Sequence, residues 1–130
     1  MLPLKYRLKR MKDFAILTAE GRFVPGALHT LKFWRIDPAK YPRRAYAADD
    51  LKIGFVVSTK VSKKAVERNR VKRQMREVVR LLLQANALRP GYLVAVVAKT
   101  SMIGKEYHEI ATDIHATLLR SGLLQKKSSA

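Results

Sequence analysis

The sequence predicts an α+β fold in the form of a two-layer sandwich of about four strands and three helices. Three observations predict it. The chain has 130 residues, the size of one domain, and 48% of them are hydrophobic, which is enough for a buried core. Segments with the two-residue period of a strand alternate with segments of helical period in the order α-β-β-β-α-β-α.

Each expected element is bounded by glycine, proline or a polar loop. The expected helices cover residues 11–19, about 65–88 and 105–119, and the expected strands cover 22–24, 28–36, 51–59 and 92–98. Side chains alternate along a strand, so Leu31 and Trp34 are expected on opposite faces of the sheet. Residues 37–50 are expected to form a long, mobile loop, and the sequence assigns it no role.

We expect a single domain over residues 1–130, with a flexible basic arm at 1–10 and a flexible tail at 123–130. The chain contains no cysteine, which excludes disulfides, thiolate nucleophiles and cysteine-type zinc sites. This composition is compatible with a reducing, cytoplasmic location. No apolar segment has the length of a membrane span, and the first residues do not have the pattern of a signal peptide.

The charge of the chain is unusual. It has 27 Lys and Arg residues against 10 Asp and Glu residues, a formal net charge of +17. The pI of about 10.6 lies in the range typical of nucleic-acid-binding domains. A compact domain with this charge repels itself unless a polyanion offsets the repulsion, so we expect a nucleic acid or an anionic membrane as partner.

The positive charge is densest where the long central helix begins. Residues 60–76 contain eight basic residues and one acidic residue, Glu67. In a helix, Val71, Met75, Val78 and Leu82 form one apolar stripe. Arg68, Lys72 and Arg76 form a second stripe about a third of a turn away.

Like charges four residues apart destabilise a helix, so this spacing favours a phosphate-binding face over an ordinary solvated one. Asn69 lies within the basic stripe, where its amide can orient a neighbouring arginine or contact a phosphate or a sugar. The predicted RNA-binding residues are Lys60, Lys63, Lys64, Arg68, Asn69, Arg70, Lys72, Arg73 and Arg76.

These residues resemble the signature of the bacterial ribonuclease P protein subunit. The resemblance is carried by the strand Ile53-Gly54-Phe55-Val56-Val57-Ser58-Thr59-Lys60 and by the helix segment Lys63-Lys64-Ala65-Val66-Glu67-Arg68-Asn69-Arg70-Val71-Lys72-Arg73, followed by Arg76-Glu77. It extends over roughly residues 5 to 122. Thr59 stands where a lysine is usual, and Thr18 stands where members often carry a second aromatic residue after Phe14.

The resemblance implies a left-handed β-α-β crossover around the central helix, whereas about 98% of such connections are right-handed. It also implies a non-catalytic subunit of an RNA-based endonuclease that removes 5′ leaders from precursor tRNA. The catalyst is then the RNA, working with Mg²⁺, and the protein has no catalytic residue, metal or cofactor of its own. The implied partners are ribonuclease P RNA and precursor tRNA, with no membrane and no obligate protein partner.

A cleft for the single-stranded leader needs aromatic surfaces and basic walls. The candidates for this leader cleft are Phe14, Leu17, Thr30, Lys32, Trp34 and Lys99. For Phe14 and Leu17 the alternative is an ordinary core position, and for Trp34 it is packing beneath the 37–50 loop.

Other functions fit the residues less well. A basic RNA-binding or ribosome-associated protein of similar fold is the main alternative, because composition alone cannot separate the two. A membrane-surface protein would need an exposed apolar face beside the charges, and a helix-turn-helix protein would need a short second helix. His108 and His115 are seven residues apart, which is not the spacing of a metal pair, and Asp49-Asp50 is an isolated acidic pair.

Overall fold

The computed structural model describes residues 2–8, 10–44 and 46–124. Within this part of the chain there are three α-helices: α1 (Met11–Glu20), α2 (Ala65–Gln84) and α3 (Tyr107–Ser121). The four strands are β1 (Arg22–Pro25), β2 (His29–Arg35), β3 (Leu51–Val56) and β4 (Tyr92–Ala98). Three 3-10 turns are also present: η1 (Leu4–Tyr6), η2 (Pro42–Arg44) and η3 (Thr100–Met102). The predicted α+β class and element order are confirmed.

The strands form one mixed sheet in the order β1-β2-β4-β3. β2 is antiparallel to both of its neighbours, and β3 is parallel to β4. Because β3 and β4 are parallel neighbours, the chain between them must cross over the sheet, and α2 makes that crossover. Its left-handedness stays a prediction from the family resemblance.

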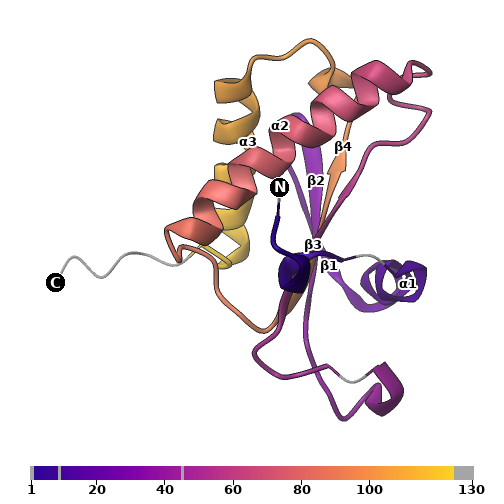
Figure 1. The fold of residues 1–130 in the computed structure, drawn as a ribbon, viewed down its shortest axis with the longest axis vertical. Helices are drawn as coiled ribbons and strands as arrows, with labels where there is room; N and C mark the ends of the chain where they lie inside the picture. Colours follow the sequence, from indigo (N-terminus) through magenta and orange to yellow (C-terminus); the bar gives the residue numbers. More distant parts are fainter. Residues whose placement is uncertain (1, 9, 45, 125–130) are drawn as a thin grey trace, which may run out of the picture.

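The helices cover both faces of the sheet (Figure 1). α2 and α3 pack side by side on one face, and α1 lies on the opposite face against β2 and β4. The expected sandwich of sheet and helices is therefore present, and α1 adds a partial third layer. The alternation predicted for β2 is confirmed, because Leu31 packs under α2 and α3 whereas Trp34 packs under α1.

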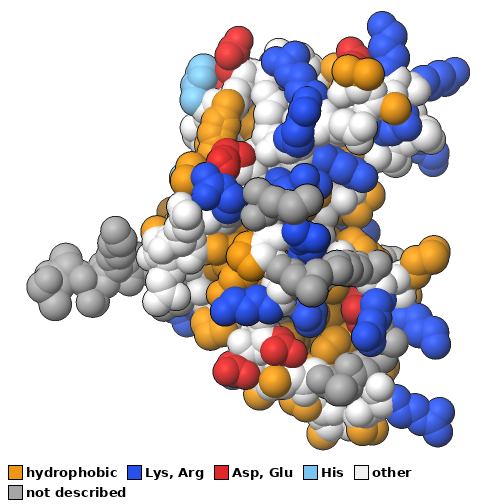
Figure 2. Space-filling view, viewed as in Figure 1, with side chains coloured by type: hydrophobic (Ala, Val, Ile, Leu, Met, Phe, Trp, Pro, Cys, Tyr) orange, Lys and Arg blue, Asp and Glu red, His pale blue; other side chains and the backbone are white. Residues whose placement is uncertain are grey.

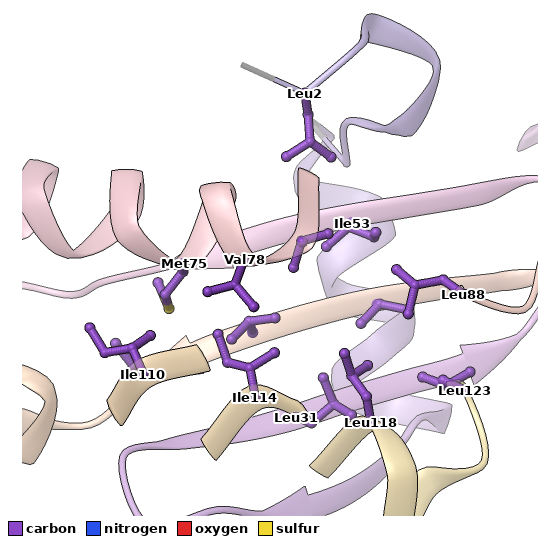
Figure 3. Close-up of a cluster of buried hydrophobic side chains, with 14 of the residues drawn as sticks. Leu2, Leu31, Ile53, Met75, Val78, Leu88, Ile110, Ile114, Leu118 and Leu123 are labelled. Atoms are coloured by element: carbon purple, nitrogen blue, oxygen red, sulfur yellow. The ribbon is translucent and has the colours of Figure 1, made fainter. Parts of the chain in front are cut away.

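The main core lies between the sheet and the α2–α3 pair (Figure 3). Side chains from both helices point toward the sheet there, and Met75, Ile110 and Ile114 are each 0% exposed. The predicted apolar stripe of α2 is the buried one, with Val79 added to it and Leu82 only half-buried at its end. One side of α2 is thus fixed in the core, and the other side remains at the surface.

Two elements end earlier than the sequence predicts. β3 ends at Val56, because the chain then turns, with Val61 N–H donating to Ser58 O over 3.0 Å. α2 ends at Gln84, four residues before the predicted end. Asn86 adopts a left-handed φ of 53°, which redirects the chain so that Leu88 is buried in the core outside the helix.

The N-terminal segment differs from the expected flexible arm. Leu2 and Leu8 are 2% and 6% exposed, and Leu8 N–H donates to Ile53 O over 3.1 Å. Arg7 pairs with Ile53 in a parallel β-bridge, so the described part of the arm extends the sheet beyond β3. At the other end, Leu123 is buried, and the rest of the expected tail, residues 125–130, lies outside the described residues.

Candidate nucleic-acid interface

The surface side of α2 carries the cations that the sequence predicts for RNA binding. Arg70 and Arg73 are exposed, as are Lys60, Lys63 and Lys64 on the segment before the helix, whereas Lys72 and Arg76 are half-buried. Figure 2 shows Lys and Arg side chains (blue) along α2 on the face that it displays. Of the described basic residues on α2, only Arg80 forms an ion pair, with Glu77 of the same helix at 2.5 Å. The remaining cations of the helix are available to an external anion.

A small hydrogen-bond network fixes the start of α2. Ser62 Oγ donates to Glu67 Oε1 over 2.5 Å and accepts from Lys64 N–H over 3.1 Å. Arg68 Nη1 donates to the Ser62 carbonyl over 2.8 Å. The negative charge of Glu67 in the first turn also interacts favourably with the helix dipole. Arg68 therefore helps to hold the helix start in place, in addition to presenting charge.

The Lys72 and Arg76 side chains reach toward the N-terminal segment. Together with Arg7 they line a pocket of about 230 Å³ at the β3 edge of the sheet. Arg7 is positioned by its bridge to β3 and by a 2.8 Å hydrogen bond from its Nε to Leu2 O. The sequence predicts a basic arm but does not place Arg7 in the site, because only the packing of the arm brings it to α2.

The opposite, α1-facing side of the sheet contains the residues predicted for a leader cleft. Strand pairing places Thr30 beside Val97, and Val97 beside Val56, in a row that is only half-buried. The next row contains Lys32, paired with Ala95. In that second row Ala95 is buried beneath α1 and Gly54 lies under the Phe14 ring, so the half-buried first row forms the partly open surface, with Lys32 at its side.

Two of the predicted cleft residues are not accessible to RNA. Leu17 is 0% exposed and Trp34 is 8% exposed, because both fill the small core beneath α1. Trp34 is covered by the 37–50 loop: Tyr41 and Tyr46 lie 5.7 and 6.0 Å from it, measured between ring centroids, in edge-on arrangements. In this structure Leu17 occupies a core position and Trp34 packs beneath the 37–50 loop, so neither side chain is open to a leader.

The 37–50 loop is attached to α1 and is not a free loop as expected. Tyr46 Oη donates to the buried Asp13 carboxylate, and Tyr41 Oη and Lys40 Nζ both donate to Glu20. The hydrogen bonds to Glu20 lower the pKa of its carboxyl group, the one from Lys40 most. The loop thus secures α1 against the sheet.

Phe14 and Lys99 lie at other parts of the expected cleft. Phe14 is half-buried and its ring lies over Gly54, where an added Cβ would stand 2.4 Å from Phe14 Cζ. Lys99 is exposed at the end of β4, and its Nζ donates to Gly26 O in the β1–β2 turn over 2.7 Å. Phe14 can present a ring edge to the open surface, and Lys99 can present a charge at its end.

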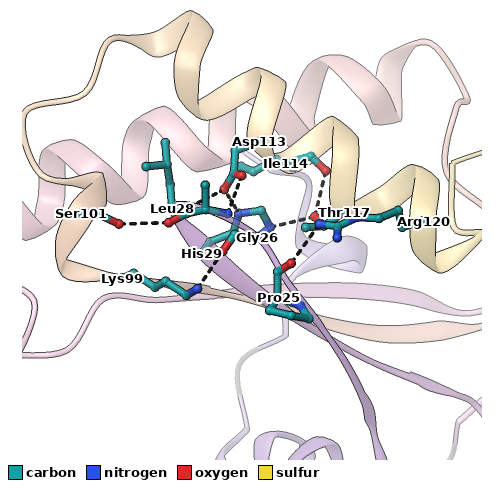
Figure 4. A network of polar contacts seen from close by, with 11 residues as sticks. Pro25, Gly26, Leu28, His29, Lys99, Ser101, Asp113, Ile114, Thr117 and Arg120 are labelled. Atoms are coloured by element: carbon teal, nitrogen blue, oxygen red, sulfur yellow. Dashed lines mark hydrogen bonds and ion pairs between the residues drawn. The ribbon is translucent and has the colours of Figure 1, made fainter.

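A buried polar network joins α3 to the β1–β2 turn (Figure 4). His29 Nδ1 lies 2.5 Å from Asp113 Oδ2, and His29 Nε2 lies 2.8 Å from Thr117 Oγ1. Asp113 also accepts the backbone N–H groups of Ala27 and Leu28, each over 2.9 Å. His29 and Thr117 are both 0% exposed, so this Asp-His-Thr arrangement is closed to substrates and has a structural role.

The surroundings of His29 and Asp113 shift the pKa values of both side chains. Burial lowers the pKa of His29, against the opposing effect of Asp113, and Lys99 and Arg120 add to the lowering. Burial acts to raise the pKa of Asp113, but hydrogen bonds from Leu28 N–H, His29 and Ala27 N–H outweigh it and hold that pKa below its usual value.

The described residues contain no cluster of three or more histidine, cysteine or acidic residues that could hold a metal ion. No helix in the described part of the chain is long and apolar enough to cross a membrane. The arrangement that stands out is therefore a basic helix face on one side of the molecule and a partly open sheet surface on the other.

Comparison with known proteins agrees with this arrangement. A family model described as Ribonuclease P matches residues 2–122. The ribonuclease P protein component of a Pseudanabaena species is 37% identical over 124 residues, covering 95% of this chain and 97% of the relative. The Staphylococcus aureus RNase P protein superposes with a TM-score of 0.74 at 20% identity, covering 92% of this chain and 98% of that one. The Thermotoga maritima RNase P protein gives 0.70 at 21% identity, over 88% and 96%. The two structures show likeness of fold.

Proposed function

The chain belongs to the ribonuclease P protein family, and from this premise we propose how its surfaces serve the removal of 5′ leaders from precursor tRNA. It acts as the protein component of ribonuclease P, with ribonuclease P RNA as its partner. The α2 face and the segment before it bind that RNA. The α1-facing side of the sheet holds the single-stranded leader of the precursor tRNA. This removal of leaders takes place in the cytoplasm.

The observation that carries this proposal is the division of α2 into two sides. Val71, Met75 and Val78 are buried against the sheet, so the helix cannot rotate to hide its cations. Lys72 and Arg73 have no acidic partner among the described residues. A rigid row of cations on a helix suits the phosphates of a folded RNA, and its binding should depend steeply on salt.

The chemistry of cleavage belongs to the RNA in this proposal. The described residues offer no metal cluster, and the buried His29 network is closed to substrate. Mg²⁺ held by the RNA would supply an activated water for hydrolysis of the phosphodiester bond between the leader and the tRNA. The protein contributes by screening the repulsion between two RNAs and by holding the leader, for which no further protein is required.

Reconstitution tests the function. The protein is added to a bacterial ribonuclease P RNA at low Mg²⁺, and cleavage of a precursor tRNA is followed. We expect correct 5′ maturation only when both protein and RNA are present. Tight RNA binding without rescue would favour the alternative of a general RNA-binding protein.

Arg73→Ala tests the interface. Arg73 is exposed and outside the helix-start network, so its removal should change the free energy of unfolding by no more than about 0.5 kcal/mol. Affinity for the RNA subunit should fall, and the slope of log affinity against log salt should become shallower by about one. Arg89→Ala, at an exposed position beyond the end of α2, is the matched control and should change neither. Equal effects of the two substitutions on RNA affinity would show that α2 is not the contact face for the RNA.

A further inference from the structure

Another pocket, with two arginines at its border, lies at the end of the sheet where α3 stops. Its volume is about 370 Å³, within the range of small-ligand sites, and its lining includes Arg22, Phe33, Arg35 and Tyr92. These four residues come from β1, β2 and β4. Strand pairing sets Arg22 opposite Phe33 and Arg35 opposite Tyr92, so the four side chains form one cluster, the sheet-end cluster.

Strand alternation places the sheet-end cluster on the α2–α3 side of the sheet. Leu31 faces that side, so Phe33 and Arg35, two and four residues further along β2, face it too. The helix α3 ends at Ser121, at the border of the pocket. The rings of Phe33 and Tyr92 are half-buried at the edge of the α2–α3 core. The cluster therefore lies on the opposite side of the sheet from the proposed leader surface.

The charges of the sheet-end cluster are not neutralised by the protein. Arg22 and Arg35 are exposed, and neither forms an ion pair or a side-chain hydrogen bond among the described residues. The acidic residue that lines the pocket, Glu20, already accepts hydrogen bonds from two side chains of the 37–50 loop. Both guanidinium groups are thus available to an external anion.

Aromatic rings beside free guanidinium groups identify what the cluster can bind. The ring centroids of Phe33 and Tyr92 are 6.3 Å apart and their planes are inclined by 60°, so neither ring covers the face of the other. An open ring face stacks on a base, and an arginine fork binds a phosphate through two parallel hydrogen bonds. A nucleotide uses both contacts. An acidic peptide would use the arginines and leave the rings without a stacking partner.

We propose that the sheet-end cluster binds one unpaired nucleotide of ribonuclease P RNA. Its base stacks on the open face of the Tyr92 ring, and Arg22 and Arg35 bind the phosphates on either side. This inference rests on the proposed function, in which α2 binds that RNA and the other side of the sheet holds the leader. Because α2 lies on the same side as the cluster, the RNA bound by α2 is the RNA that can reach it.

The first test uses the free full-length protein and three probes: adenosine 5′-monophosphate, ribose 5-phosphate and adenosine. Backbone amide shifts of residues 22, 33–35 and 92 in NMR spectra report binding at the cluster. Adenosine 5′-monophosphate should bind about fivefold or more tightly than ribose 5-phosphate, the lower end of the gain for one stacked base. Adenosine should also bind more weakly, because it lacks the phosphate. Equal affinities for the two phosphates would indicate a simple anion site and overturn the proposal, as would tighter binding of a pentaglutamate peptide.

Variants separate the two contacts. Tyr92→Leu should reduce the affinity for adenosine 5′-monophosphate to that for ribose 5-phosphate, since leucine keeps apolar area at the edge of the core but has no π-face. Tyr92→Phe should retain the affinity, and Arg35→Gln should weaken both phosphates. Lys12→Gln, exposed at the other end of α1 from Glu20, is the matched control and should change nothing. Urea unfolding shows that each variant is folded. If Tyr92→Leu binds the nucleotide as tightly as the wild type, stacking is ruled out.

The second test measures assembly with ribonuclease P RNA in the absence of precursor tRNA. Tyr92→Leu should weaken assembly without changing its salt dependence. The double substitution Arg22→Gln and Arg35→Gln should also make the slope of log affinity against log salt shallower, by about one for each arginine. Unchanged assembly with weaker binding of precursor tRNA would overturn the assignment to ribonuclease P RNA. Failure of the wild-type protein to assist cleavage would count against the proposed function, while the probe titrations would still report on the cluster.

Discussion

The α2–α3 side of the sheet is filled by apolar side chains from two helices, whereas α1 covers only part of the opposite side. On the first side, Met75, Ile110 and Ile114 are 0% exposed and meet side chains from the strands. On the second side a smaller core around Leu17 and Leu93 is supplemented by hydrogen bonds between α1 and the 37–50 loop. The rest of that side is half-open.

The difference shows how a chain of this charge can fold and still present a binding surface. Each like-charge pair four residues apart on α2 costs about 0.2–0.5 kcal/mol, whereas burying one large apolar side chain contributes about 1.5–3 kcal/mol. The buried side of α2 therefore outweighs the repulsion on its surface side. Because the α2–α3 core contains most of the buried apolar side chains, the α1 side can leave part of the sheet uncovered for a ligand.

Truncating one residue in each core should give the largest effect and the clearest contrast. Ile114→Ala removes a 0% exposed side chain from the α2–α3 core and should lower the free energy of unfolding by about 2–5 kcal/mol. Ile16→Ala, at an 8% exposed position beneath α1, should cost less, because the smaller core can relax around the cavity. Urea unfolding followed by circular dichroism measures both. An equal or greater loss for Ile16→Ala would mean that the two faces contribute alike.

A methyl group at Gly54 should disturb the α1 side alone. Its Cβ would lie 2.4 Å from Phe14 Cζ, so the ring must move, and we expect a loss of about 1–3 kcal/mol in unfolding free energy. In a Phe14→Ala background the same Gly54→Ala change should cost much less, because the clashing atoms are absent. Unfolding of the four variants in a double-mutant cycle measures the coupling. Additive losses would show that Phe14 does not pack on Gly54.

The sequence predicts most of the fold because each element has its own local signal. The continuous apolar segment before Lys99 predicts β4 with its observed bounds, and the period around Met75 predicts which side of α2 is buried. The end of α2 is less predictable, because the apolar residues Ala87 and Leu88 fit both a longer helix and a turn into the core. The left-handed φ at Asn86 ends the helix in a local cap, in which Asn86 N–H donates to Leu83 O over 3.1 Å and Ala87 N–H donates to Leu82 O over 2.9 Å.

Some residues of the candidate site can likewise be predicted from the sequence, whereas the accessibility of others cannot. The cations of α2 follow from spacing, since a helix with one buried side must expose the other. Alternation places Trp34 on the correct face of the sheet, but whether a ring on that face is open or covered depends on how Tyr41 and Tyr46 of the 37–50 loop pack against it.

The His29 network offers the smallest of these effects and a test of how α3 is held to the sheet. His29 faces Asp113 and Thr117 of α3, with Lys99 and Arg120 nearby. Because the folded state lowers the pKa of His29, the folded protein binds a proton there less readily than the unfolded chain does. The contribution of His29 to stability is therefore complete above the ordinary pKa of about 6.5, and it is lost as the pH falls through the lowered pKa.

Urea midpoints measured between pH 8 and pH 5.5 should therefore fall in the wild-type protein. In His29→Gln the midpoint should be lower at pH 8 and should change less with pH, since no buried imidazole remains to be protonated. His108→Gln removes an exposed imidazole from the same helix that carries Asp113, and it should keep the wild-type pH dependence. A wild-type protein that gains stability as the pH falls would mean that the attraction of Asp113 outweighs burial and that His29 is held as a cation. The contact between α3 and the β1–β2 turn would then be an ion pair.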